Sequence, residues 1–208
     1  MQVTIGDPGV SRSVAATARR AQIVAATIAV IVESGYSQTS FARIAERAGL
    51  SSTRLISYHF AGKAELVGAV ITEITTAIGR HMAQRMAGQP DAKHELDAYI
   101  RGLVEFIKDH PVQMQALTGI FLDFRTDDGS RSYDTSDDKD ALGLVEDMLR
   151  AGQSAGLFRD FDTFVMASAI QRSLDGLPFL LQTRPDLDLD AYGEELVTLF
   201  DLATRSAR

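Results

Sequence analysis

The chain has 208 residues, of which 45% are hydrophobic and 24% charged, and its 21 basic and 28 acidic side chains give a net charge of −7. This length allows one large domain or two smaller ones, and the composition excludes a wholly disordered or collagen-like chain. Because the sequence contains no cysteine, disulfide scaffolds, thiolate zinc sites, iron–sulfur clusters and cysteine nucleophiles are excluded as well.

The charge is unevenly distributed along the chain. Residues 11–63 hold seven basic and two acidic side chains, a net charge of +5, whereas residues 69–208 hold 14 basic and 24 acidic ones, a net charge of −10. A basic amino-terminal quarter on an acidic body favours a segment that faces phosphates. The alternative is a chance fluctuation of charge over a short stretch.

The chain begins with a predicted flexible arm over residues 1–13, which show no periodicity. Residues 14–34 predict a first helix that ends at Gly35 and is apolar on nearly all sides, so we expect it to be buried. Its longest apolar run covers the 12 residues 21–32, fewer than the ~20 that a bilayer-spanning helix needs. No signal-peptide cleavage site follows. We therefore expect no membrane segment and a cytoplasmic location.

Two short helices are predicted next. Thr39 or Ser40 can cap the first, which ends at Gly49, and the serine pair 51–52 can cap the second, which runs to about Phe60. Two short helices joined by a glycine-centred turn are typical of a helix-turn-helix. The apolar stripe of the first is formed by Phe41, Ile44, Ala45 and Ala48.

The rest of the chain predicts six more helices and one loop. Residues 125–138, which include five aspartates, predict a solvated loop. Pro178 is expected to kink or end the helix that contains it. No segment alternates like a strand, so the predicted fold is all-α with about nine helices. The six helices are expected over residues 63–87, 92–108, 111–124, 140–154, 163–182 and 191–205.

The segment from Thr39 to Leu66 resembles the tetracycline-repressor (TetR) family of bacterial transcriptional regulators. Between Gly49 and Phe60 the chain has one residue more than is usual in that family, and this residue is most simply placed at Leu50-Ser51. The resemblance therefore leaves two adjacent positions open for each base-contacting residue. The resemblance covers residues 14–68 and rests on four features: Thr39-Ser40, Ile44-Ala45 with Ala48-Gly49, Tyr58-His59-Phe60, and Lys63.

The resemblance implies a fold and a function. Residues 14–62 would form a three-helix DNA-binding domain, and residues 63–208 a helical ligand-binding and dimerisation domain. The protein would be a bacterial regulator, foremost a repressor, that binds a palindromic double-stranded DNA operator as a homodimer. A small apolar or amphipathic effector bound in the second domain would release it. No cofactor and no membrane partner are implied.

The third predicted helix has residue types suited to reading DNA. An α-helix fits the major groove, and small polar residues near its amino terminus let the backbone approach base edges. We expect this chemistry from Ser52, Thr53, Arg54 and Ser57, with Arg54 able to fork onto guanine. Side chains suited to phosphate oxygens are Thr39, Ser40, Arg43, Tyr58, His59 and Lys63. The alternative is that Tyr58 and His59 merely cover the core of the small domain.

Two further sets of residues are candidates in the second domain. The effector pocket is predicted from residues that equally suit a plain core: Met82, Met86, Phe106, Met114, Phe121 and Arg172. The family's dimers generally form through a four-helix bundle of the last two helices, and the apolar residues of those helices here are Phe164, Ile170, Leu174, Leu177, Leu196, Leu199, Phe200 and Ala203.

No enzyme or metal signature is predicted. Residues 152–156 spell the G-x-S-x-G pattern, but that motif needs a strand before it. An amphipathic helix precedes it here, which favours a pair of helix-ending glycines, Gly152 and Gly156. None of the four histidines lies three or four residues from another, so no metal-ligand spacing is present. Two alternatives stay open: a helical binding or adaptor protein without DNA binding, and a helical serine hydrolase that uses Ser154.

Overall fold

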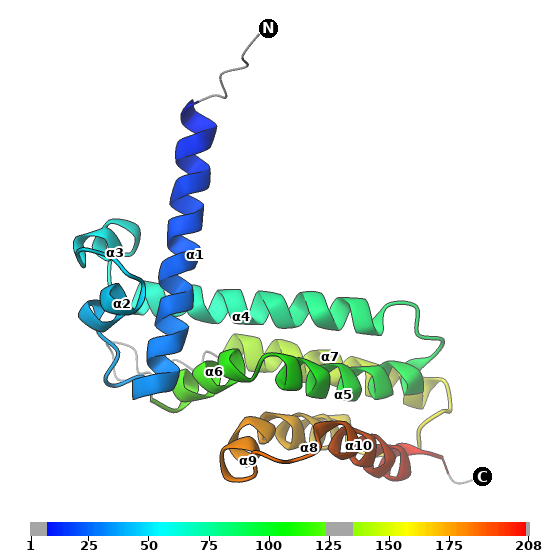
Figure 1. Ribbon diagram of the computed structural model, residues 1–208. Helices are drawn as coiled ribbons and strands as arrows, with labels where there is room; N and C mark the ends of the chain where they lie inside the picture. The colour runs from blue at the N-terminus through cyan, green and yellow to red at the C-terminus, as the bar shows by residue number, and fades with distance from the viewer. Residues whose placement is uncertain (1–7, 124–134, 207–208) are drawn as a thin grey trace, which may run out of the picture. The chain divides into compact units, whose positions relative to one another are not determined.

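The computed structural model of the protein describes residues 8–123 and 135–206, and within these ranges it confirms the all-α fold. Figure 1 shows the ten helices. Their bounds are α1 Pro8–Ser34, α2 Phe41–Arg47, α3 Arg54–His59, α4 Lys63–Met86, α5 Ala92–Asp109, α6 Pro111–Asp123, α7 Thr135–Ser154, α8 Thr163–Asp175, α9 Leu177–Thr183 and α10 Leu189–Thr204.

Three predicted helix boundaries differ from the structure by more than two residues. Helix α1 begins at Pro8, inside the predicted arm, because a proline suits the first turn of a helix, where its missing N–H has no partner anyway. Helix α7 begins at Thr135, within the predicted loop, of which residues 125–134 lie outside the described ranges. The helix predicted over residues 163–182 is two helices, since α8 ends at Gly176 and Pro178 lies in the first turn of α9.

The chain divides into two compact units. The amino-terminal unit comprises Met1–Ile74 and Gln115–Ser130, and the carboxy-terminal unit comprises Thr75–Met114 and Arg131–Arg208. Helices α4 and α6 each supply residues to both units. The sequence predicts a different division, at residue 62, between a DNA-binding domain and a ligand-binding and dimerisation domain. That functional division stays a prediction.

The core of the amino-terminal unit explains why α2 and α3 form at all. Helices of seven and six residues are unstable alone in water, and here each is held by a fully buried isoleucine, Ile44 in α2 and Ile56 in α3. These two side chains belong to the interior that α1 and the start of α4 also supply. Its other buried members include Ile23, Val24, Ile28, Ile31, Phe60, Leu66, Val67 and Val70.

The same packing accounts for the apolar character of α1. By length and composition alone, Val14–Ser34 is long and apolar enough to cross a bilayer, although its longest uncharged run covers only residues 21–32. A core helix passes the same test, and Ile23, Val24 and Ile31 are each at most 4% exposed within the unit. The apolar face of α1 is therefore covered by protein.

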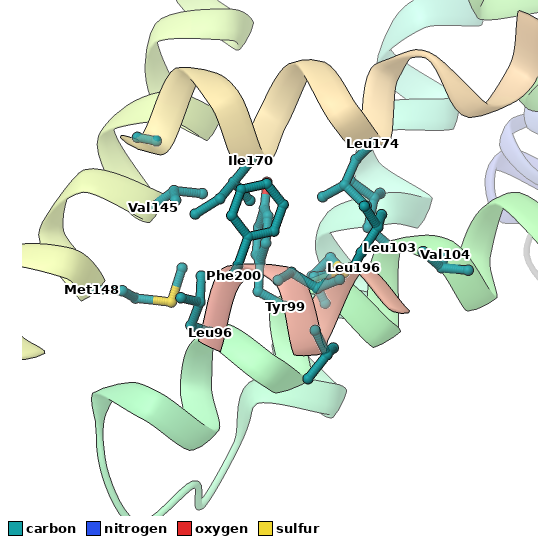
Figure 2. Packing of buried hydrophobic residues seen from close by; sticks show 14 of the residues in the cluster. Leu96, Tyr99, Leu103, Val104, Val145, Met148, Ile170, Leu174, Leu196 and Phe200 are labelled. Atoms are coloured by element: carbon teal, nitrogen blue, oxygen red, sulfur yellow. The ribbon is translucent and has the colours of Figure 1, made fainter. Parts of the chain in front are cut away.

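Four helices supply most of the core of the carboxy-terminal unit, to which α4 and α9 add Met82 and Leu177. Figure 2 shows side chains from α5, α7, α8 and α10 meeting in one cluster, with Tyr99, Ile170 and Phe200 among them. Gly193 of α10 allows close approach to α5, because a Cβ placed there would lie 3.3 Å from Cγ1 of Val104. The core sits where α5 faces these three other helices.

The G-x-S-x-G pattern lies at the end of α7. Gly152 and Ser154 are helical residues, and Gly156 has a φ of +71°, the left-handed value with which a glycine commonly ends a helix. Among the described residues no strand precedes the motif. Gly156 therefore ends the helix as predicted, whereas Gly152 lies inside α7, so the prediction of a helix-ending glycine pair holds for one of the two glycines. The geometry of a nucleophile elbow is absent at these residues.

Candidate nucleic-acid interface

The α2 and α3 helices are joined by a tight turn whose geometry follows from local sequence. Ser40 caps α2, its Oγ accepting a hydrogen bond from the backbone N–H of Arg43 at 3.4 Å. At the other end Gly49 has a φ of +64°, which favours glycine. This turn lets the N–H of Leu50 donate to the carbonyl of Ala45 at 2.8 Å. The helix-turn-helix arrangement predicted from the sequence is therefore present.

Helix α3 presents a polar face to solvent and a single apolar residue to the core. Ile56 is fully buried, whereas Tyr58 is 81% exposed. The hydroxyl of Ser52 accepts a hydrogen bond from the N–H of Arg54 at 3.1 Å, although Thr53 occupies the capping position of the backbone. The expected cap at Ser52 is thus displaced by one residue. The predicted base-reading residues are all exposed: Ser52, Thr53, Arg54 and Ser57.

The residues predicted to contact phosphate do not all lie at the surface. Ser40 and Arg43 are exposed. Partly exposed His59 packs edge-on against the ring of Tyr58, with centroids 5.1 Å apart. Thr39 is only 4% exposed, and its hydroxyl donates to the carbonyl of Gly35 at 3.0 Å. Its hydroxyl closes the turn after α1 and is covered by protein, so the structure does not support a phosphate contact by Thr39, and that contact stays a prediction.

Lys63 at the start of α4 has a structural partner. Its Nζ donates to the carbonyl of Tyr36 at 2.9 Å and lies 4.0 Å from the centroid of the Tyr36 ring. Partial burial lowers the pKa of Lys63 below its ordinary value and raises the pKa of the Tyr36 hydroxyl. Two of the three ammonium donors of Lys63 are not engaged by that carbonyl, so its predicted contact with phosphate stays a prediction.

The arginines near α3 differ in whether an acidic side chain pairs with them. Arg47 pairs with Glu33 at 3.2 Å, and Glu65 lies 3.7 Å from Arg20. Arg43 and Arg54 have no ion-pair partner among the described side chains of this unit and are exposed. Two free guanidinium groups on neighbouring helices make a surface suited to a polyanion.

Sequence reasoning missed the residues of α1 that hold the helix-turn-helix. Arg20 donates to the carbonyl of His59, and Gln22 donates from Nε2 to the carbonyl of Ala48 at 2.8 Å. Nothing in the sequence distinguishes these side chains from others on the exposed side of an amphipathic helix. The only signal was that Arg20 belongs to the basic amino-terminal segment, and this suggests a phosphate contact instead.

The predicted pocket residues do not form one set. Met82 and Phe106 are buried in the carboxy-terminal unit, and Met86 and Met114 pack partly buried against its core. Phe121 belongs to the amino-terminal unit. Arg172 is exposed, with Nη1 2.9 Å from Oδ2 of Asp175. The methionines and Phe106 are packed as core, so the assignment of these six residues to a pocket stays a prediction.

The predicted dimer residues divide into buried and exposed ones. Five belong to the buried cluster of the carboxy-terminal unit, so they are covered within the chain itself and are unavailable to a second copy. These five are Ile170, Leu174, Leu177, Leu196 and Phe200, with exposures of 0 to 7%. Phe164 and Leu199 are more than half exposed, as are Val165 and Leu202, which the sequence argument missed. Ala203 is partly exposed.

The comparison with known proteins bears on the same segment of the chain. Residues 23–70 match the family model described as bacterial regulatory proteins, tetR family. A curated relative, the HTH-type transcriptional regulator BetI 1 of Chromohalobacter salexigens, is 33% identical over 87 residues, which are 42% of this chain. The match spans 41% of the length of that relative.

Solved structures resemble the chain over more of its length. The MbdR regulator from Azoarcus sp. CIB superposes with a TM-score of 0.75, at 24% identity, over 88% of this chain and 96% of that one. A bacterial regulatory protein in the tetR family from Rhodococcus RHA1 gives a TM-score of 0.79 at 18% identity, over 91% of this chain and 98% of that one. At these identities the likeness is one of fold.

Proposed function

We propose that this chain, whose residues 23–70 match the family model of bacterial regulatory proteins of the tetR family, is a transcriptional regulator, foremost a repressor, that binds a palindromic DNA operator. The observation that carries the proposal is α3, a surface helix whose one fully buried residue is Ile56 and whose outer face is polar. Arg54 on that face would read guanine in the major groove, while Arg43 and Lys63 would contact phosphates. Such a protein acts in the bacterial cytoplasm, where its DNA lies.

The exposed apolar side chains of α8 and α10 support a homodimer. Phe164, Val165, Leu199 and Leu202 are each between 53% and 61% exposed. Large apolar side chains gathered on two helices favour a protein interface, and a second copy of the same surface would cover them with two-fold symmetry. Two copies would place their α3 helices in successive major grooves, about 34 to 36 Å apart or a multiple of that distance.

The effector is proposed to be a small apolar or amphipathic molecule that binds in the carboxy-terminal unit. The support is chemical: Met82, Met86 and Met114 are flexible, polarisable side chains at or beside the core, and methionines adapt readily to a guest. The effector need only bind the DNA-incompetent conformation better than the competent one. A coupling of ~1 to 3 kcal/mol would change DNA affinity about 5- to 150-fold.

Selection of bound duplexes from a random DNA pool tests the DNA-binding proposal. We expect enrichment of one inverted repeat whose half-sites are separated by whole helical turns. Arg54→Ala should relax the preference at one base pair in each half-site. A pool that stays random after repeated selection, with no mobility shift at low salt, would refute the proposal and favour a helical adaptor that does not bind DNA.

Sedimentation of interface variants tests the homodimer. Leu199→Glu places a charge in the proposed interface, and we expect it to convert the dimer to a monomer and to weaken operator binding. Leu144→Glu is the matched control, because Leu144 is a comparably exposed leucine, at 44%, on α7. If both variants sediment like the wild type, the interface is not formed by α10.

A further inference from the structure

Side chains from one turn of α1 reach the carboxyl ends of both helices of the helix-turn-helix. Gln22 donates to the carbonyl of Ala48, the residue that ends α2. Arg20, two residues earlier, donates through Nη1 to the carbonyl of His59, the last residue of α3. The last carbonyls of a helix have no partner within that helix. Helix α1 therefore supplies the missing donors to α2 and α3.

Arg20 also holds the connection that leads from α3 into α4. Its guanidinium lies over the ring of buried Phe60, 4.1 Å from the centroid, and Nη2 lies 3.7 Å from Oε1 of Glu65. The other carboxylate oxygen of Glu65 accepts a hydrogen bond from the N–H of Ala61 at 2.7 Å. One planar cation thus contacts the end of α3, the residue after it and the first turn of α4.

We propose that Arg20 is a positioning residue that fixes the orientation of α3 for sequence-specific DNA binding, and that it is not a phosphate contact. The inference rests on the proposed function, in that α3 is the helix that reads bases. Arginine suits this place because its fork donates in two directions within one plane, whereas lysine is a point charge. A cation at the end of α3 is also favoured by the partial negative charge of the carbonyls there.

Orientation matters here because α3 is short. A helix of six residues has little hydrogen bonding of its own, so its direction depends on what holds its two ends and on the packing of Ile56. Base-specific contacts need side chains within hydrogen-bond distance of the right edges, whereas nonspecific contacts to phosphate tolerate a tilt. Loss of Arg20 should therefore harm specific binding more than nonspecific binding.

The test compares two duplexes over a range of salt concentrations: one enriched by the wild-type protein from a random pool, and one of random sequence. For Arg20→Met we expect binding to the enriched duplex to weaken about tenfold, as for one mismatched base pair, while binding to random DNA changes less than about threefold and the salt dependence keeps its slope. Arg20→Lys, which keeps the charge, should bind random DNA like the wild type and still lose affinity for the enriched duplex.

Two variants calibrate the measurement. Arg47→Met removes the same charge and one ion pair with α1, but Arg47 belongs to α2, and we expect its two affinities to fall in parallel or not at all. Arg43→Met removes a proposed phosphate contact and should lower the salt slope by about 0.9. If Arg20→Met behaves like Arg43→Met, with both affinities reduced and a shallower slope, Arg20 is a phosphate contact and the inference is wrong. If Arg20→Met changes neither affinity, the inference is also wrong.

A measurement without DNA separates this inference from the proposed function. The amide of Phe60 donates to the carbonyl of Ile56 in α3, and the amide of Ala48 donates to the carbonyl of Ile44 in α2, each at 2.9 Å. Arg20→Met should speed hydrogen exchange at Phe60 more than at Ala48, whereas a general loss of stability would speed both alike. Equal acceleration refutes the positioning role. If the wild type selects no duplex but the exchange is selective, the proposed function fails and the positioning of α3 by Arg20 stands.

Discussion

The two units of this protein use their side chains under different constraints. In the amino-terminal unit the helices α2 and α3 are so short that individual residues decide their form: Ser40 caps one, Gly49 turns the chain, and buried Ile56 and the contacts of Arg20 hold the other. In the carboxy-terminal unit α5, α7, α8 and α10 are longer and are held by a broad apolar cluster. Many apolar residues satisfy a core of this kind equally well.

The two units should therefore tolerate substitution differently. A fold that depends on buried volume accepts many apolar residues of similar size, whereas the cap at Ser40 and the turn at Gly49 each depend on one residue. Substitutions should therefore act through packing in the second unit and through specific contacts in the first.

The largest effect is expected at Gly152, where the packing of the carboxy-terminal unit can be broken. A Cβ at this position would lie 2.1 Å from Cδ2 of the buried Phe158 ring. Gly152→Ala should therefore lower the free energy of unfolding by about 3 kcal/mol, as measured by urea denaturation. Gly143→Ala on the same helix is the control, since nothing lies within 4 Å of its Cβ, and it should raise stability by up to about 1 kcal/mol. If both substitutions change the free energy of unfolding by the same amount, the Phe158 ring moves to accommodate the new methyl group.

A specific contact in the amino-terminal unit is expected to rank second. Arg54→Ala should weaken binding to the selected operator by about 1 to 3 kcal/mol and leave the free energy of unfolding nearly unchanged, because the side chain is exposed. Fluorescence anisotropy with labelled duplexes measures the first quantity and urea denaturation the second. If the free energy of unfolding falls by as much as the free energy of binding, Arg54 has a structural role and its DNA contact is not supported.

A buried polar pair makes a smaller contribution in the second unit. Tyr99 donates from its hydroxyl to Oε1 of Gln171 at 2.7 Å, and both residues are buried. Tyr99→Phe leaves that oxygen without its donor and should cost about 1 to 2 kcal/mol of unfolding free energy. Val145→Ala, a deletion of buried apolar atoms in the same cluster, provides a comparison whose effect should not depend on pH.

The Tyr99 hydroxyl also predicts a dependence on alkaline pH. Burial, and secondarily the charge of Asp175, raises the pKa of Tyr99 in the folded protein. The unfolded chain therefore loses this proton first, near the ordinary tyrosine pKa of about 10. The contribution of the buried hydroxyl is complete below that pH and is lost as the pH rises from there toward the raised pKa of the folded protein. Stability should therefore fall as the pH rises above about 10, and less steeply in Tyr99→Phe; parallel curves would refute the assignment.

The smallest effect is expected from the exposed ion pairs that join α5 to α10. Nε and Nη2 of Arg101 donate to the two carboxylate oxygens of Glu194 at 2.6 and 2.8 Å, and this lowers the pKa of Glu194. Because both side chains are about half exposed, Arg101→Met should cost below about 1 kcal/mol, and less at high salt. The contribution is present above the ordinary pKa of a glutamate and is lost as the pH falls. A salt-independent loss would point to packing by the arginine stem instead.

The sequence by itself determined much of the fold and the type of the DNA-binding domain. Glycines 35, 49 and 156 end helices at the predicted places, and Pro178 divides a predicted helix in two. The polar face of α3 is exposed as expected. Caps, turns and periodicity are properties of a few neighbouring residues, so they can be read from the chain without knowledge of what packs against it.

Only the tertiary structure decided what covers each face. Periodicity shows that Leu196, Leu199 and Phe200 lie along one helix, but burial alone separates Leu199, which is exposed, from the other two. Thr39 and Arg20 likewise look like phosphate contacts in the sequence. In the fold the hydroxyl of Thr39 is buried, and the guanidinium of Arg20 donates a hydrogen bond to the last residue of α3. The partner of a side chain depends on residues distant in sequence, brought near by packing, and a local pattern holds no information about them.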